Sequence, residues 1–155
     1  MSTKDYSNKQ ESTIARYFDW NTVVGSGARD FHYGDIISTD WLGECKTHTK
    51  PQDKITFFRK HWKKISEEAL FHHRNPVLIV DNGTQNPSST FCMFKYTFDS
   101  LENYTISSLE FDGTNVILKV SDIESGKIYK ISKFDDFSAV YISRADTFKE
   151  LLENC

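Results

Sequence analysis

The sequence lacks any long hydrophobic run. No apolar stretch approaches the ~20 consecutive residues that a membrane-spanning helix needs. The first residues, MSTKDYSNKQEST, are polar and do not contain the apolar segment of a secretory signal peptide. We therefore expect no membrane partner and no secreted product.

Cysteine is scarce and scattered. The chain has three cysteines, Cys45, Cys92 and Cys155, an odd number without a CxxC pair. This pattern favours a reducing cytoplasm over a disulfide framework. The neighbouring histidines His72 and His73 lack an accompanying cysteine pair, so a zinc site is not expected.

No internal repeat, low-complexity segment or linker is visible. The 155 residues, 38% hydrophobic and 26% charged, suit one globular domain with a modest core. We therefore treat residues 1–155 as a single domain.

Excess positive charge is absent overall but present locally. The formal net charge is −3, which argues against a nucleic-acid binder. Residues 1–45 carry −3 and residues 75–155 carry −5, whereas residues 46–74 carry +5. A local basic surface can attract phosphates on a mildly acidic protein. Lys50, Lys60 and Lys64 are its predicted phosphate contacts, which would position DNA without reading its sequence.

The hydrophobic pattern predicts an α/β fold with a central mixed sheet flanked by helices. The run PVLIV at 76–80 is typical of a buried central strand. Residues 1–8 are predicted to be disordered. Helices are expected at 9–18, from Phe58 to before Asn75, and over ADTFKELLEN near the C-terminus. Strands are expected at 22–24, 35–38, 41–46, 54–57, 76–80, 90–96, 106–111, 115–120 and 127–131.

One predicted hairpin carries chemistry. Because side chains alternate along a strand, Glu44 and Lys46 share a face, and Cys45 points to the other. Asp35 lies on the neighbouring predicted strand, near enough for its carboxylate to approach that of Glu44. Two repelling carboxylates and the backbone carbonyl of Cys45 would suit Mg²⁺, which prefers oxygen ligands and keeps several waters. The Lys46 ammonium beside the ion would offset charge on a phosphate.

Further motifs follow in a fixed order along the chain. These are Glu11 in KQESTIARYF, Gly25-Ser26-Gly27, Gly34-Asp35-Ile36, Glu44-Cys45-Lys46-Thr47, Glu67-Glu68-Ala69 and Pro76-Val77-Leu78-Ile79. In this order the chain resembles the PD-(D/E)XK nucleases, most closely the archaeal and phage Holliday junction resolvase-like members. The resemblance covers about residues 9–81 and leaves a β-rich part, 90–155, outside it.

The resemblance implies a restriction-endonuclease-like fold and a Mg²⁺- or Mn²⁺-dependent endonuclease acting on branched DNA. Asp35 and Glu44 would be metal ligands, together with the Cys45 carbonyl, and Lys46 the catalytic lysine. Glu11 would bind metal or orient water, and Ser26 would approach a phosphate. The family usually cuts as a homodimer, in a prokaryotic or phage-infected cell.

Three alternatives remain open at this point. Asp35, Glu44 and Lys46 could be an exposed strand face that carries a salt bridge. The chain could be a sequence-specific restriction or homing endonuclease of the same fold, with specificity elements beyond Thr90. It could also be a non-catalytic DNA-binding or assembly protein that keeps the fold.

Overall fold

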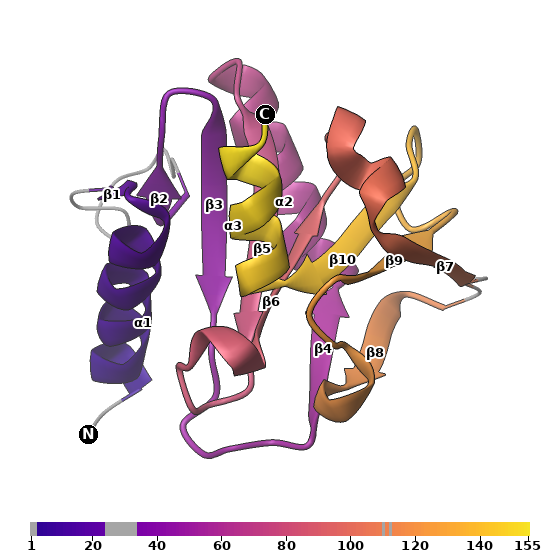
Figure 1. Ribbon diagram of the computed structural model, residues 1–155. Coiled ribbons are helices and arrows are strands. Elements are labelled where there is room, and N and C mark those ends of the chain that lie inside the picture. Colours follow the sequence, from indigo (N-terminus) through magenta and orange to yellow (C-terminus); the bar gives the residue numbers. More distant parts are fainter. Residues whose placement is uncertain (1–2, 24–33, 110, 112) are drawn as a thin grey trace.

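The protein is a mixed α/β structure whose large sheet is flanked by helices, as a computed structural model shows for residues 3–23, 34–109, 111 and 113–155 (Figure 1). Its three described α-helices are α1 (Thr3–Phe18), α2 (Arg59–Phe71) and α3 (Ala145–Glu153). The large sheet comprises β1 (Asn21–Thr22), β2 (Ile36–Ile37), β3 (Trp41–Lys46), β5 (Asn75–Asp81), β6 (Thr90–Phe94), β7 (Thr105–Leu109), β9 (Lys127–Ile131) and β10 (Val140–Arg144). A small sheet pairs β4 (Lys54–Phe58) with β8 (Asn115–Lys119).

The large sheet has the strand order β1-β2-β3-β5-β6-β10-β9-β7. Its pairs β3–β5 and β7–β9 are parallel, and the other pairs are antiparallel. Parallel neighbours need a crossover, and between β3 and β5 that crossover consists of β4 and α2. The predicted central strand is confirmed, because β5 lies between β3 and β6 and is buried from Pro76 to Asp81.

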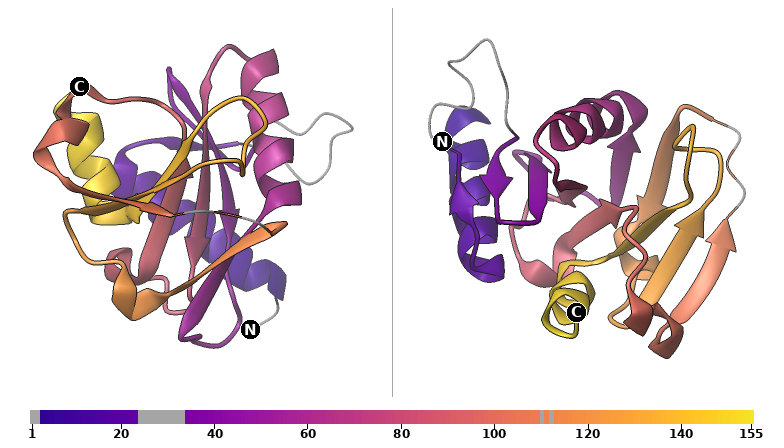
Figure 2. Two further views of the ribbon diagram at one scale, coloured as in Figure 1. Left: turned by 90° about the vertical axis from the view of Figure 1, so that its right-hand side faces the viewer. Right: turned by 90° about the horizontal axis from the view of Figure 1, so that it is seen from above.

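Helices α2 and α3 lie on opposite sides of the sheet (Figure 2), and a hydrophobic cluster lies on each of its two faces. On one face, Ile14 of α1 and Phe148 of α3 pack against Trp41 and Cys45 of β3. On the other face, Trp62 of α2 packs in the same cluster as Leu42 of β3, together with residues of β4 and β8. Strand β3 therefore sends alternate side chains into two different layers. In the described residues, no helix is both long and apolar enough to cross a bilayer.

Residues 3–8 are helical, which corrects the prediction of disorder for that part of residues 1–8; residues 1–2 lie outside the described residues. Helix α1 begins at Thr3, with Asp5 in its first turn, where an acidic side chain is favourable. The backbone carbonyl of Tyr6 also accepts a hydrogen bond from Nε2 of Gln85 at 2.8 Å. This tertiary contact stabilises the first half of α1, whose polar composition alone suggested disorder.

One further prediction about the elements was wrong, and one strand was missed. Phe58 is the last residue of β4, not the first apolar contact of the following helix, and its side chain is 38% exposed. Strand β10 was not predicted, although it lies in the middle of the sheet between β6 and β9. Strand β10 is only five residues long. The polar segment FDDFS lies shortly before it and helix α3 follows it directly, so its hydrophobic pattern is too short to stand out.

Candidate active site

The β2–β3 hairpin brings Asp35 beside Glu44. Ile37 pairs with Leu42 and Ile36 with Gly43, so the antiparallel register leads Asp35 alongside Glu44. The backbone N–H of Asp35 donates to the Gly43 carbonyl at 2.8 Å. Gly34 makes the entry possible: its φ is +73°, and a Cβ there would lie 2.9 Å from the Gly43 oxygen.

The Asp35 carboxylate is fixed against the edge of β3. Its Oδ2 accepts a hydrogen bond from the backbone N–H of Cys45 at 2.8 Å. The N–H and the carbonyl of a strand residue point toward the same edge. The Cys45 carbonyl therefore faces the Asp35 side of β3. This carbonyl is one of the predicted metal ligands.

Three carboxyl groups crowd this end of the hairpin. Burial, followed by the charge of Glu44, raises the pKa of Asp35 to about 8, and Glu11 adds to that shift. Burial and the charge of Glu44 also raise the pKa of Glu11, which approaches Asp35 from helix α1. The carboxyl groups therefore repel one another wherever a cation does not separate them.

Among these carboxylates, Glu44 is the one that pairs with lysine side chains. It is buried, with 4% of its surface exposed, whereas 41% of the Lys46 side chain that pairs with it is exposed. Its Oε1 lies 3.7 Å from Nζ of Lys46, and its Oε2 accepts a hydrogen bond from Nζ of Lys64 at 2.8 Å. Burial opposes ionisation, but Lys64 and then Lys46 outweigh it and lower the pKa of Glu44.

Helix α2 places basic side chains near this end of β3. Lys60 and Lys64 lie on either side of His61 in the sequence, and His61 feels the charges of both and of Lys46. Burial and these charges lower the pKa of His61 to about 4, so the imidazole is neutral at pH 7. Nζ of Lys60 lies 5.7 Å from the ring centroid of exposed Phe58. Around the end of β3, the exposed side chains are therefore basic and the buried ones acidic.

Gln10 of helix α1 holds the end of β3, and the sequence reasoning missed it. Its side chain is fully buried, and its Nε2 donates to the backbone carbonyl of Lys46 at 2.7 Å. The spacing of Gln10, Ile14 and Phe18 contained the signal, because four-residue steps put a glutamine on an otherwise apolar helix face.

Asp81 is a second missed residue, and it stabilises the neighbouring strand end. Its Oδ2 accepts hydrogen bonds from Oγ1 of Thr47 at 2.7 Å and the N–H of Gly83 at 2.9 Å. Its Oδ1 accepts from the N–H of Gln85 at 2.8 Å and Oγ1 of Thr90 at 3.3 Å. This fully buried carboxylate joins the chain after β3 to the chain after β5.

The structure brings together Asp35, Glu44 and Lys46, which the strand pattern grouped, and Glu11, which only the family resemblance added. It adds Lys64, predicted as a phosphate contact, to the same cluster. Lys50 and Lys60 are exposed, Lys50 on the loop between β3 and β4. Ser26 lies outside the described residues.

The donor set suits a hard divalent ion. In the described ranges, no group of three or more His, Cys, Asp and Glu side chains is arranged to hold a metal. Mg²⁺ needs fewer side-chain ligands, since it is usually bound through one or two carboxylates and retains several waters. Asp35, Glu44 and the Cys45 carbonyl supply that number of oxygen ligands, and Asp35 and Glu44 lie close enough for each to shift the pKa of the other.

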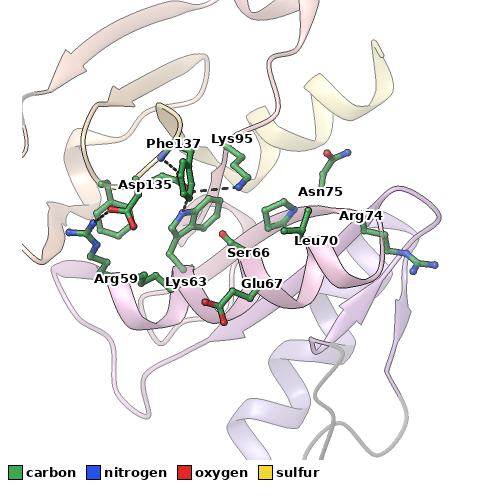
Figure 3. A pocket seen from close by; sticks show the side chains of 14 residues that line it. Arg59, Lys63, Ser66, Glu67, Leu70, Arg74, Asn75, Lys95, Asp135 and Phe137 are labelled. Carbon is green, nitrogen blue, oxygen red and sulfur yellow. Dashed lines mark hydrogen bonds and ion pairs between the residues drawn. The ribbon is translucent and has the colours of Figure 1, made fainter.

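A separate hollow lies on the other flank of helix α2 (Figure 3). Its volume is about 350 Å³, and Trp62, Lys63, Ser66 and Phe137 are among the residues that line it. Nε1 of Trp62 donates to Oδ2 of Asp135 at 2.8 Å across it. None of the clustered carboxylates lines this hollow, so it is not the candidate site.

Comparison with known proteins found no match: no family model, no curated protein and no solved structure is significantly similar to the chain.

Proposed function

We propose that the protein is a metal-dependent DNA endonuclease of the restriction-endonuclease-like fold that hydrolyses phosphodiester bonds in branched DNA. One observation supports this above the others. Asp35, Glu44 and Lys46, which the sequence pattern grouped, meet at the end of β3 with Glu11 beside them. Buried acidic oxygens next to an ammonium are the arrangement that metal-assisted phosphodiester hydrolysis needs.

The chain's residues would divide the work as follows. Asp35, Glu44 and the Cys45 carbonyl would hold Mg²⁺ or Mn²⁺. The chemistry that such an ion supplies when bound is activation of a water and neutralisation of phosphate charge. The Lys46 ammonium, 3.7 Å from Glu44, would offset negative charge that develops on the phosphate oxygens. Glu11 would orient the attacking water from helix α1.

The basic residues around the site support a polyanionic substrate. Residues 46–74 carry a net +5, and they include the exposed Lys50 and Lys60. These ammonium groups would bind phosphates on either side of the cleaved bond, which positions DNA without reading its bases. The proposed assembly is a homodimer, whose two sites would act on two strands.

Cleavage assays test the proposal directly. The purified protein would be incubated with a four-way junction, a flap and a linear duplex, each with and without Mg²⁺. We expect Mg²⁺-dependent cleavage of the branched substrates. Preference for one linear sequence would instead favour the restriction or homing alternative. Binding without cleavage, in Mg²⁺ or Mn²⁺, would favour the non-catalytic alternative.

Matched variants locate the site. Asp35→Asn and Lys46→Met are each expected to reduce cleavage by about 100-fold or more, the usual scale for a group acting on the transition state. DNA binding should change little. Asp40→Asn is the control, because Asp40 is exposed in the turn at the opposite end of the same hairpin. Cleavage that survives in both site variants would place the chemistry elsewhere.

A further inference from the structure

The buried carboxylate of Glu44 pairs with two ammonium groups of the same chain. Lys46 approaches Oε1 at 3.7 Å, and Lys64 donates to Oε2 at 2.8 Å. A buried carboxylate that loses its partner is strongly destabilising, so the cations have a structural reason to be there. The same oxygens are, however, the ones that the proposed function assigns to a divalent ion.

The two lysines are exposed to a similar extent, 41% for Lys46 and 43% for Lys64, but they differ in the other carboxylates within their reach. Lys46 belongs to the same strand as Glu44 and shares its face. Lys64 comes from helix α2. Its Nζ already lies 3.9 Å from Oε1 of Glu68, one helical turn further along. Lys64 therefore has a second carboxylate within reach when Glu44 is taken.

We infer that Lys64 is the counter-ion of the metal-free site, bound to Glu44 until a divalent cation displaces it toward Glu68 or a DNA phosphate. This inference rests on the proposed metal site and goes beyond it. Lys64 would be a positioning residue: it keeps the Glu44 carboxylate ionised and correctly oriented while no metal is bound. Its displacement would deliver a free ammonium to the DNA side of the site at the moment when the metal binds.

The inference predicts the sign of a change in metal affinity. If Lys64 competes with the cation, removing its ammonium must tighten metal binding. If Lys64 only holds the site together, removing it must loosen metal binding, because Glu44 loses its orientation. The two roles therefore give opposite results in a measurement that needs neither DNA nor turnover.

The measurement is Mn²⁺ binding to the full chain by titration calorimetry, with electron paramagnetic resonance to count the free ion. We expect Lys64→Gln to lower the Kd for Mn²⁺ by roughly three- to tenfold, the scale of removing one nearby like charge. Lys63→Gln is the matched control, since Lys63 is the next residue of α2 but lines the hollow on the other flank. Its Kd should stay within about twofold of the wild-type value, because a distant charge is screened.

Two more variants complete the design. Lys64→Arg keeps the positive charge and should bind Mn²⁺ no more tightly than the wild-type protein. Glu44→Gln removes the shared acceptor and should bind Mn²⁺ more weakly in either background. Far-ultraviolet circular dichroism of each variant checks that the fold is intact.

The outcomes separate this inference from the proposed function. Unchanged or weaker Mn²⁺ binding by Lys64→Gln, with binding by the wild-type protein intact, overturns the exchange and leaves the metal site standing. Absence of Mn²⁺ binding by the wild-type protein and by Lys64→Gln overturns both. Tighter binding in Lys64→Gln alone supports the exchange.

Discussion

Gln10 and Lys46 are 36 positions apart in the chain, yet Nε2 of Gln10 donates to the Lys46 carbonyl at 2.7 Å. This contact attaches helix α1, which carries Glu11, to the end of the strand that carries Glu44. It fixes the distance between acidic groups from two separate elements. A buried amide in this position therefore supports the geometry of the site as well as the stability of the fold.

Replacing Gln10 by Ala is expected to lower the free energy of unfolding by about 1–3 kcal/mol, because a buried carbonyl and its packing lose their partner. Urea unfolding followed by tryptophan fluorescence measures the effect. Gln52→Ala is the control, since exposed Gln52 also donates to a backbone carbonyl, that of Lys50. An equal loss in both variants would contradict the role assigned to Gln10.

The central part of the candidate site was predictable from the sequence because it depends on local rules. Strand alternation put Glu44 and Lys46 on one face, and one short turn brought Asp35 to the neighbouring strand. Gln10, His61 and the second cation on Glu44 depend instead on how α1 and α2 pack on the sheet. No spacing within α2 reveals that Lys64 reaches 20 residues back to Glu44.

The same distinction holds for the fold. Strand β5 was predictable because it contains a continuous apolar run, and β9 was predicted although Lys130 interrupts its apolar residues. Strand β10 and the first half of α1 were not, because partners distant in the sequence stabilise them: β10 is paired on both sides, and Tyr6 is held by Gln85. Local propensity is weaker than such tertiary contacts.

The three cysteines should differ in reactivity. Burial raises the pKa of the Cys45 and Cys92 thiols well above their ordinary value, whereas Cys155 is exposed. Because the thiolate is the reactive form, only Cys155 should react rapidly with Ellman's reagent in the native protein. All three should react in denaturant. Cys155→Ser should abolish the fast phase, and a fast phase that persists would show that Cys45 or Cys92 is accessible.

Asp81 should be among the most sensitive polar residues outside the carboxylate cluster. Asp81→Asn replaces an acceptor oxygen by an NH₂ group, so two of four hydrogen bonds are lost and donors face one another. We expect a loss of about 2–4 kcal/mol in the free energy of unfolding. The control is Asp53→Asn, an exposed aspartate in the loop before β4, which should cost about 0.5 kcal/mol or less.

The metal-free protein should become less stable as pH rises from about 6.5 to 8.5. Burial and the neighbouring carboxylates raise the pKa of Asp35 from 3.8 to about 8 on folding. The folded state then binds more protons than the unfolded chain, so the free energy of unfolding falls with pH. His61, whose lowered pKa is about 4 against an ordinary 6.5, has the opposite effect, which lies mostly below pH 6.5 and fades above it.

Chemical unfolding at several pH values measures this slope. A fall of about 1–2 kcal/mol is expected for the wild-type protein and for Asp40→Asn across that interval. Asp35→Asn should lack the fall, since its side chain has no proton to lose. A parallel fall in Asp35→Asn would assign the slope to another group.

Divalent metal should reverse this loss of stability. Mg²⁺ binds the ionised carboxylates, and binding to the folded state alone adds about 1.4 kcal/mol at tenfold its Kd. For a domain of this size, that corresponds to a rise in Tm of about 4 °C. Because protons compete for Asp35, the rise should be larger at pH 8.5 than at pH 6.5. Asp35→Asn and Glu44→Gln should lose it, and Asp40→Asn should keep it. An equal rise in all the variants would show that Mg²⁺ binds somewhere other than the end of β3.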